Sequence, residues 1–237
     1  MLAERTYPLF MLGRWEEALA ASEEFTPEQI NVGGTMASLL QSAVEIYIRR
    51  GALDGASRLL SMFSQFEDTT DVQDRTCYLG SRAALRRAEG RFREALADGE
   101  ATIEAVPALG IQFQAVKQGI VEAVEAAFAL GESAKIEELL TLVEGIPLGT
   151  RPPYLDAQAR RFLARLDGDP SGYEAAAERF RDLGLPFWLA VTLLENGELT
   201  GDAESLAEAR EIFERLEARP WLERLEAVAP KRTEVHA

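Results

Sequence analysis

The 237-residue sequence has one cysteine, Cys77, and one histidine, His236. A single thiol cannot form an internal disulfide bond, and a chain without a distributed cysteine pattern is typical of a reducing compartment. No stretch approaches the roughly 20 apolar residues that a transmembrane helix needs, and the N-terminus lacks the basic-then-apolar order of a signal peptide. We therefore expect a cytoplasmic protein with no membrane anchor.

Basic residues are also scarce. The sequence has 25 Lys and Arg residues and 40 Asp and Glu residues, which gives a formal net charge of −15 and a pI near 4.6. Nucleic acids and anionic lipid surfaces are bound through cation contacts. A field of this sign repels both, so we expect no nucleic acid and no membrane among the partners.

Motifs that carry chemistry are missing from the sequence. There is no phosphate-binding Gly-x-x-x-x-Gly-Lys, no Gly-x-Ser-x-Gly elbow and no Cys or His pairing at metal-ligand spacing. His236 is next to the last residue, where a tail residue is a better interpretation than a metal ligand. Cys77 fits a small buried filler better than a reactive thiol. The sequence thus predicts no catalytic residue, no metal site and no cofactor, and hence no enzyme.

The sequence does contain a repeated motif. LGRWEEAL at 12–19 returns as AEGRFREAL at 88–96 and, more weakly, as RGALDGA at 50–56. Fainter copies continue the series, with intervals of 33 to 41 residues between the anchoring glycines, which are Gly13, Gly51, Gly90, Gly131, Gly168 and Gly201. A period in this range is typical of stacked supersecondary units.

The segments before these glycines carry apolar residues at helical spacing, as in the run from Ile120 to Phe128. Each unit reads as helix, glycine turn, helix, because a glycine after a helix can take the left-handed conformation that closes the C-terminus. We expect an all-α protein, an α-α superhelix of about six helical hairpins. The expected helices are 3–12, 14–25, 28–50, 52–66, 71–89, 91–105, 109–130, 132–145, 152–167, 171–183, 186–199, 202–217 and 219–228.

Residues 1–229 are expected to form one helical-repeat domain, with a flexible tail at 230–237. The first repeat looks truncated, because only twelve residues precede Gly13. Phe10, Met11 and Leu12 offer apolar surface where the end of a repeat array needs a polar cap. We therefore expect further chain upstream of Met1, and self-association into a homodimer through this exposed end.

Two aromatic residues mark the strongest repeats. Trp15 and Phe92 each lie two residues after a glycine, and Ala18 and Ala95 follow three residues later. On a helix, this places a large ring and a small residue on one face, so a neighbouring helix can approach while the ring fills the gap. We expect both rings to be core residues, so that Phe92→Ala should cost about 3–5 kcal/mol.

The spacing of Gly90, Phe92, Ala95 and Pro107 resembles the tetratricopeptide repeat family, although the units here are longer. LGRWEEAL at 12–19 and AREIFERLEARPWL at 209–222 resemble the helical arrays that end large bacterial regulators. The resemblance implies a chain coupled to an upstream signalling ATPase, and often to a nucleotide cyclase or a helix-turn-helix. It also implies that the partner is a protein or peptide, or the upstream domains of the same polypeptide.

In that family, the first helix of each pair lines a concave groove, and residues 13, 10, 6 and 3 before the glycine share one face. Small residues at Cys77, Gly80 and Ala84 predict a notch in the groove floor. The polar residues of the implied partner-binding groove are Ser38, Gln41, Glu45, Arg87, Gln118, Glu125, Gln158 and Arg165. Amides, single charges and isolated rings suit an extended peptide or a partner helix, and ordinary packing residues are an equal alternative.

Basic residues cluster at Arg82, Arg86 and Arg87 and at Arg160 and Arg161. Solvated pairing with neighbouring Glu residues is a better interpretation of them than a clamp for an acidic ligand.

Two functions fit these patterns. The first is a non-catalytic protein-interaction scaffold, the helical-repeat segment of a larger bacterial transcriptional or signalling regulator. The alternative is an effector-sensing domain that binds a small molecule or peptide in the concave groove. A sensor needs a concave, mostly apolar pocket with a few convergent polar groups, whereas a scaffold can use a long open surface. The dispersed polar stripe favours the scaffold.

Overall fold

A computed structural model describes residues 3–23 and 35–228 of the chain. Every regular element in these ranges is a helix, which confirms the all-α prediction. The elements are α1 (Ala3–Met11), α2 (Trp15–Glu23), α3 (Thr35–Arg49), α4 (Leu53–Ser61), η2 (Ser64–Phe66), α5 (Val72–Ala88), α6 (Phe92–Ile103), α7 (Val106–Leu109), α8 (Gln114–Leu130), α9 (Ser133–Glu144), α10 (Pro153–Asp167), α11 (Pro170–Asp182), α12 (Pro186–Thr200), α13 (Ala203–Leu216) and α14 (Arg219–Val228).

The boundaries follow the sequence prediction except in three places. The helix expected over 52–66 ends at Ser61, because Phe63 leaves the helical region with φ −117° and buries its ring beside Phe66. A short helix, α7, occupies part of the segment before Gly110 and was not expected. The helix expected from 109 begins only at Gln114. Three predictions lie outside the described residues. They are the end of one helix at residue 25, the start of the next at residue 28, and the tail at 230–237, which contains His236.

The repeat glycines behave as predicted. All six have positive φ, between +62° and +77°, a backbone conformation that side chains with a Cβ rarely adopt. Gly184, which the repeat pattern did not include, has φ +67° and separates α11 from α12 in the same way. Positive-φ glycines therefore separate the two helices of each pair at every one of the six repeat positions.

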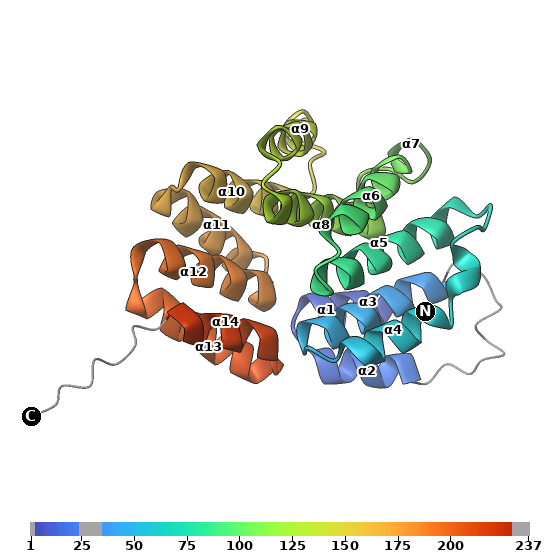
Figure 1. Ribbon diagram of the computed structural model, residues 1–237, viewed down its shortest axis with the longest axis horizontal. Coiled ribbons are helices and arrows are strands. Elements are labelled where there is room, and N and C mark those ends of the chain that lie inside the picture. The colour runs from blue at the N-terminus through green and yellow to red at the C-terminus, as the bar shows by residue number, and fades with distance from the viewer. Residues whose placement is uncertain (1–2, 24–34, 229–237) are drawn as a thin grey trace, which may run out of the picture.

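Consecutive helices pack as pairs. α1 contacts α2, α3 contacts α4, α5 contacts α6, α8 contacts α9, α10 contacts α11 and α12 contacts α13, while α7 and α14 stand outside these pairs. The first helices of neighbouring pairs also contact each other, as α3 does α5 and α5 does α8. Figure 1 shows the pairs following one another along an arch that runs from α1 and α2 through α8 to α13 and α14.

The two ends of the arch meet. Gly13 packs so tightly against α12 that a Cβ there would lie 2.7 Å from Cγ of Pro186. The ring of Trp15 packs on Phe187 with centroids 5.8 Å apart, and Arg50 Nε donates to the carbonyl of Leu216 at 3.4 Å. We call this contact between α1–α3 and α12–α14 the closure.

The closure changes the expectation for the first repeat. Phe10 is buried, and its carbonyl accepts a hydrogen bond from Trp15 Nε1 at 3.0 Å. Leu12 stays half-exposed and lies beside Gly184, just before α12. Much of the apolar end that should drive self-association is therefore covered within the chain itself, and dimerisation stays a prediction.

The two repeat rings differ in burial. Trp15 is 2% exposed and belongs to the main core, and the alanines that follow both rings, Ala18 and Ala95, are fully buried. Phe92 is only half-buried. The prediction that Phe92 is a core ring is therefore wrong, and the ring contacts of the described residues give it no partner of the kind that Phe187 is for Trp15.

Candidate functional site

The inner face of the arch is filled by charged residues of both signs. Four glutamates and four arginines come together from five helices: Glu45 and Arg49 on α3, Arg87 on α5, Glu122 and Glu125 on α8, Arg161 and Arg165 on α10, and Glu195 on α12. Their formal charges cancel, as groups removed from water require. We call these eight residues the inner network.

On the α3 side, an amide chain joins two helices. Gln41 Nε2 donates to Gln118 Oε1, and Gln118 Nε2 donates to Glu45 Oε1. The other oxygen of Glu45 accepts from Arg49 Nε at 3.1 Å. Burial raises the pKa of Glu45 and lowers that of Arg49, since each loses the water that stabilises its charge.

On the α10 side, arginines bridge neighbouring helices. Arg161 Nη1 donates to Glu195 Oε1 at 3.0 Å, and Nη2 donates to Glu125 Oε1. Arg165 Nη1 reaches Glu125 Oε2 at 3.0 Å. Burial alone would raise the pKa of Glu125, but the field of the neighbouring arginines outweighs it and lowers the pKa to about 2. Glu195 has less cationic compensation, and burial raises its pKa.

Seven of the eight predicted groove residues lie on this inner face. Gln41, Glu45 and Gln118 form the amide chain, and Gln158 Oε1 accepts from Arg161 Nε at 3.0 Å. The other three predicted side chains take part in ion pairs, namely Arg87 with Glu122, Glu125 with Arg161 and Arg165, and Arg165 with Glu125 and Glu195. Ser38 lies on α3, and its side chain is outside what the structure describes. The predicted polar residues are thus mostly engaged with one another.

The groove positions predicted from the sequence did not include every residue of this face. Arg49 and Glu122 each lie four residues after a predicted member, Glu45 and Gln118, and a step of four stays on one helical face. Arg161 was among the predicted basic spots, but its pairing is fully buried instead of solvated. Glu195 on α12 has no counterpart in the stripe, which ended at α10.

The predicted notch is also wrong. A Cβ on Gly80 would lie 3.4 Å from the carbonyl oxygen of Ala115, and Cys77 and Ala84 are fully buried. The small residues of α5 therefore admit α8 to close packing and leave no recess for a partner.

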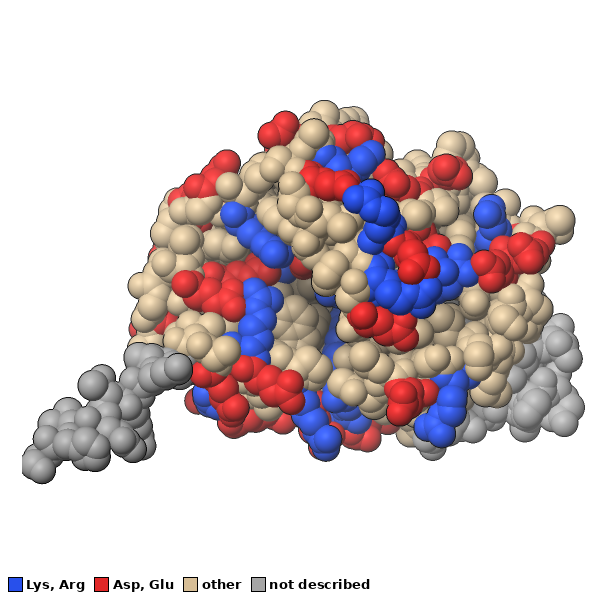
Figure 2. Space-filling view, in the orientation of Figure 1, with Lys and Arg blue, Asp and Glu red and all other residues tan. Residues whose placement is uncertain are grey.

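An open cavity of about 520 Å³ lies between the inner network and the closure. Figure 2 shows a hollow on this face of the molecule, bordered by basic and acidic side chains. The charged residues that line the cavity are Glu45, Arg49, Arg50, Arg87, Glu122, Glu125, Arg219 and Glu223. A volume of this size is within the range of small-molecule sites.

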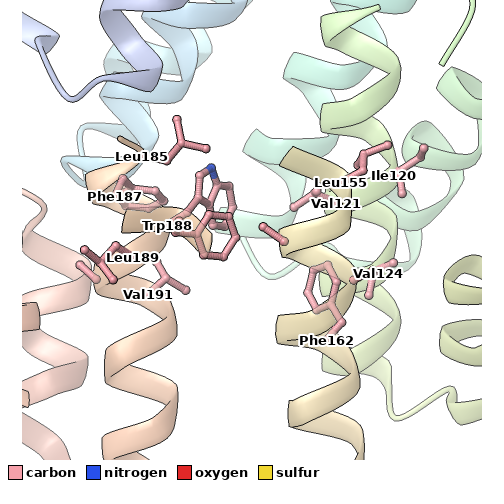
Figure 3. Close-up of a cluster of buried hydrophobic side chains, with 14 of the residues drawn as sticks. Ile120, Val121, Val124, Leu155, Phe162, Leu185, Phe187, Trp188, Leu189 and Val191 are labelled. Carbon is pink, nitrogen blue, oxygen red and sulfur yellow. The ribbon is translucent and has the colours of Figure 1, made fainter. Parts of the chain in front are cut away.

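One wall of the cavity is aromatic. Phe187, Trp188 and Trp221 line it, and the ring of Phe187 meets those of Trp188 and Trp221 edge to face, with centroids 5.2 and 5.4 Å apart. Figure 3 shows Trp188 extending from α12 into the space beside α10 and α8, toward Leu155 and Val121. The guanidinium carbon of Arg49 lies 3.9 Å from the Phe187 centroid and 5.1 Å from that of Trp188. Apolar rings and convergent polar groups therefore line the same cavity.

Within the described ranges, no group of three or more His, Cys, Asp or Glu residues is arranged to hold a metal ion. In the same ranges no helix has both the length and the apolar content to cross a lipid bilayer. Comparison with protein-family models, with curated proteins and with solved structures gives no match to this chain.

Proposed function

We propose that this chain is a non-catalytic sensor domain that binds a small molecule in the cavity between the inner network and the closure. The observation that carries the proposal is the closure itself, because it adds a second wall to the inner face of the arch and so makes a cavity of it. The cavity combines an aromatic wall with eight charged residues, and apolar surface beside convergent polar groups is the character expected of a ligand site. The alternative derived from the sequence is thus the better supported of the two functions.

The geometry also suggests how binding could be reported. Cavity-lining residues come from α3, α4, α5 and α8 on one side and from α12 and α14 on the other. A ligand that touches both sides binds the closed arrangement more tightly than an arrangement in which the ends separate. Such a ligand shifts the population toward the closed arrangement in proportion to that difference in affinity.

The wider assignments are part of the same proposal. The helical pairs are units of a tetratricopeptide-like superhelix, supported by the six positive-φ glycines and the pairwise contacts. The resemblance of 12–19 and 209–222 to the arrays of bacterial ATPase-linked regulators supports a cytoplasmic, signal-reading segment of such a regulator. Upstream domains of the same polypeptide would then receive the signal.

A blocked cavity tests the sensor. Ala88 is exposed, ends α5 and lines the cavity, so Ala88→Trp should fill the entrance without disturbing the core. Thermal unfolding of the full chain is followed against a collection of small metabolites. A ligand at 100 times its Kd should stabilise the wild-type protein by about 2.7 kcal/mol, and Ala88→Trp should lose this stabilisation.

The matched control is Ala97→Trp, at an exposed alanine on α6 that does not line the cavity. This variant should respond to ligands as the wild-type protein does. Stabilisation that persists in Ala88→Trp, or a collection in which no compound stabilises the wild-type protein, would contradict the sensor.

A protein-interaction scaffold is the second candidate, and one surface favours it. Leu148, in the segment after α9, is 77% exposed, and Leu142 on α9 is also exposed. Large exposed apolar side chains close in sequence are a common feature of contact surfaces. If this surface binds a protein, Leu148→Asp should abolish binding to the upstream domains while leaving metabolite-dependent stabilisation unchanged.

A further inference from the structure

Arg49 is held in an unusual state beside the cavity. It is 7% exposed, and its guanidinium lies against the rings of Phe10 and Phe187 at 4.4 and 3.9 Å from their centroids. The hydrogen bonds of the described residues give it a single acceptor, Glu45, which is reached through Nε. Its two Nη nitrogens have no acceptor there, although a guanidinium has five N–H donors to satisfy.

Trp188, beside Arg49, carries a donor that is fully buried. Its indole N–H is buried and has no acceptor among the described residues. Trp188 and Arg49 both line the cavity, and the Arg49 guanidinium carbon lies 5.1 Å from the Trp188 ring centroid. Buried donors without acceptors cost free energy unless something accepts from them. Of the two residues, Arg49 is the one whose donors an occupant of the cavity can reach, because the Trp188 indole N–H has no accessible surface whereas Arg49 lines the cavity and uses only Nε within the described chain.

Three of the four carboxylates that line the cavity are, by contrast, already occupied. Glu45 accepts from Arg49 and Gln118, and Glu122 accepts from Arg87 through both oxygens, at 2.5 and 3.3 Å. Glu125 is bound by the two arginines of α10. These three glutamates have few free acceptor positions for a cationic ligand. We therefore expect the ligand to be an anion.

The mouth of the cavity adds little net charge. Arg219 and Glu223 are both exposed on α14, and within the described chain neither forms an ion pair. The whole lining contains four arginines and four glutamates, so its formal charges cancel. A single negative charge is therefore easier to accommodate than the double charge of a phosphate monoester, because each further charge in an electroneutral, partly desolvated site must be compensated.

From this arrangement we propose that the cavity binds a small organic monocarboxylate with an aromatic or branched apolar body. The carboxylate accepts from the Nη groups of Arg49, and the body packs against Phe187, Trp188 and Trp221. A guanidinium edge matches the two oxygens of a carboxylate in a paired, planar contact. This inference rests on the proposed sensor function and specifies the class of its ligand.

Three probes of one shape test the ligand class: 3-phenylpropionate, its primary amide and 3-phenylpropylamine. Isothermal titration calorimetry on the full chain measures each affinity. The carboxylate should bind about tenfold or more tightly than the amide, since it gains a charge-assisted pair of hydrogen bonds. The amine should bind most weakly.

Arg49→Lys then identifies the contact. Lysine keeps a positive partner for Glu45 but cannot offer two parallel N–H groups. The variant should weaken carboxylate binding by about tenfold and leave amide binding unchanged. Arg181→Lys is the matched control, because Arg181 pairs with Glu208 on the exposed surface and does not line the cavity. It should change neither affinity.

The outcomes separate the two proposals. Equal affinities for carboxylate and amide, tighter binding of the amine, or a carboxylate Kd weaker than about 10 mM would overturn the ligand class. The sensor function would still stand if other metabolites stabilise the wild-type protein and Ala88→Trp removes that effect. Carboxylate binding that survives Ala88→Trp would place the ligand elsewhere and overturn both.

Discussion

Arg161 of α10 and Glu195 of α12 form an ion pair of 3.0 Å at a place that water does not reach. Arg161 is 0% exposed and Glu195 is 4% exposed. Arg161 also donates to Glu125 of α8 and Gln158 of α10, so one guanidinium holds three helices. A charge buried to this degree is tolerated only while its partners are in place.

Removal of this guanidinium should therefore be costly. Arg161→Leu leaves Glu195 and Glu125 buried with fewer compensating charges, and breaking a buried pair in this way costs about 3–5 kcal/mol. Chemical denaturation of the full chain measures the change. Arg181→Leu is the matched control, because Arg181 pairs with Glu208 at 2.9 Å on the exposed surface, where such a pair contributes about 0–1 kcal/mol. Equal losses in the two variants would show that the inner network is not desolvated.

Glu125 should make stability depend on acidity. Its pKa falls from 4.5 to about 2 in the folded chain, so its contribution is complete above the unfolded pKa and disappears as the pH falls through the folded one. Glu45 and Glu195, whose pKa values are raised by burial, act in the opposite direction. Comparison with Glu125→Gln isolates the first effect.

The measurement is the free energy of unfolding of both proteins across the acidic range. Wild-type protein should be the more stable above pH 4.5, and the difference should shrink steadily toward pH 2. A difference that does not vary with pH would mean that Glu125 is not held ionised by Arg161 and Arg165.

Local sequence signals predicted the elements, and long-range contacts decided the site. Gly13 and Trp15 are visible as repeat residues because their roles, a positive φ and a ring near a helix start, depend on a few neighbours along the chain. Nothing local indicates that Trp15 meets Phe187 far along the chain. The same ring position in the third unit, Phe92, lacks such a partner and is half-buried.

The candidate site shows the same division. The helical stripe found Gln41, Glu45 and Gln118, because they share faces that point inward. It could not show that these residues would bind one another instead of a partner, since that follows from how closely α3 and α8 approach. The aromatic wall and the free Nη groups of Arg49 depend on the closure, which brings α12 and α14 to α3.

A close helix crossing gives a prediction for the fold itself. α6 and α8 meet at glycines, and a Cβ on Gly119 would lie 1.7 Å from Thr102 Oγ1. Gly119→Ala should therefore force the helices apart and destabilise the protein by about 1–3 kcal/mol. Gly149→Ala is the control, because a Cβ there meets nothing within 4 Å and its φ is not positive. Thermal unfolding should separate the two variants clearly, and equal melting temperatures would contradict the observed crossing.

The closure makes a prediction about local opening. Arg50 Nη2 pairs with Glu16 at 2.5 Å and lies 3.7 Å from Glu217, and Arg50 Nε donates to the Leu216 carbonyl. Arg50→Ala should release the ends of the arch from each other. Amide hydrogen exchange should accelerate about five- to thirtyfold in α1, α2, α13 and α14, as a loss of one or two kcal/mol implies.

The middle of the arch separates this effect from general destabilisation. Amides of α6 and α8, which pack on each other and are far along the chain from both ends, should exchange at wild-type rates in Arg50→Ala. Arg58→Ala, at an exposed arginine of α4 with no ion pair in the described chain, should leave the ends protected. Uniform acceleration would show that the molecule opens as one unit. In that case a ligand could not act through the ends alone, because the closure would have no equilibrium of its own to shift.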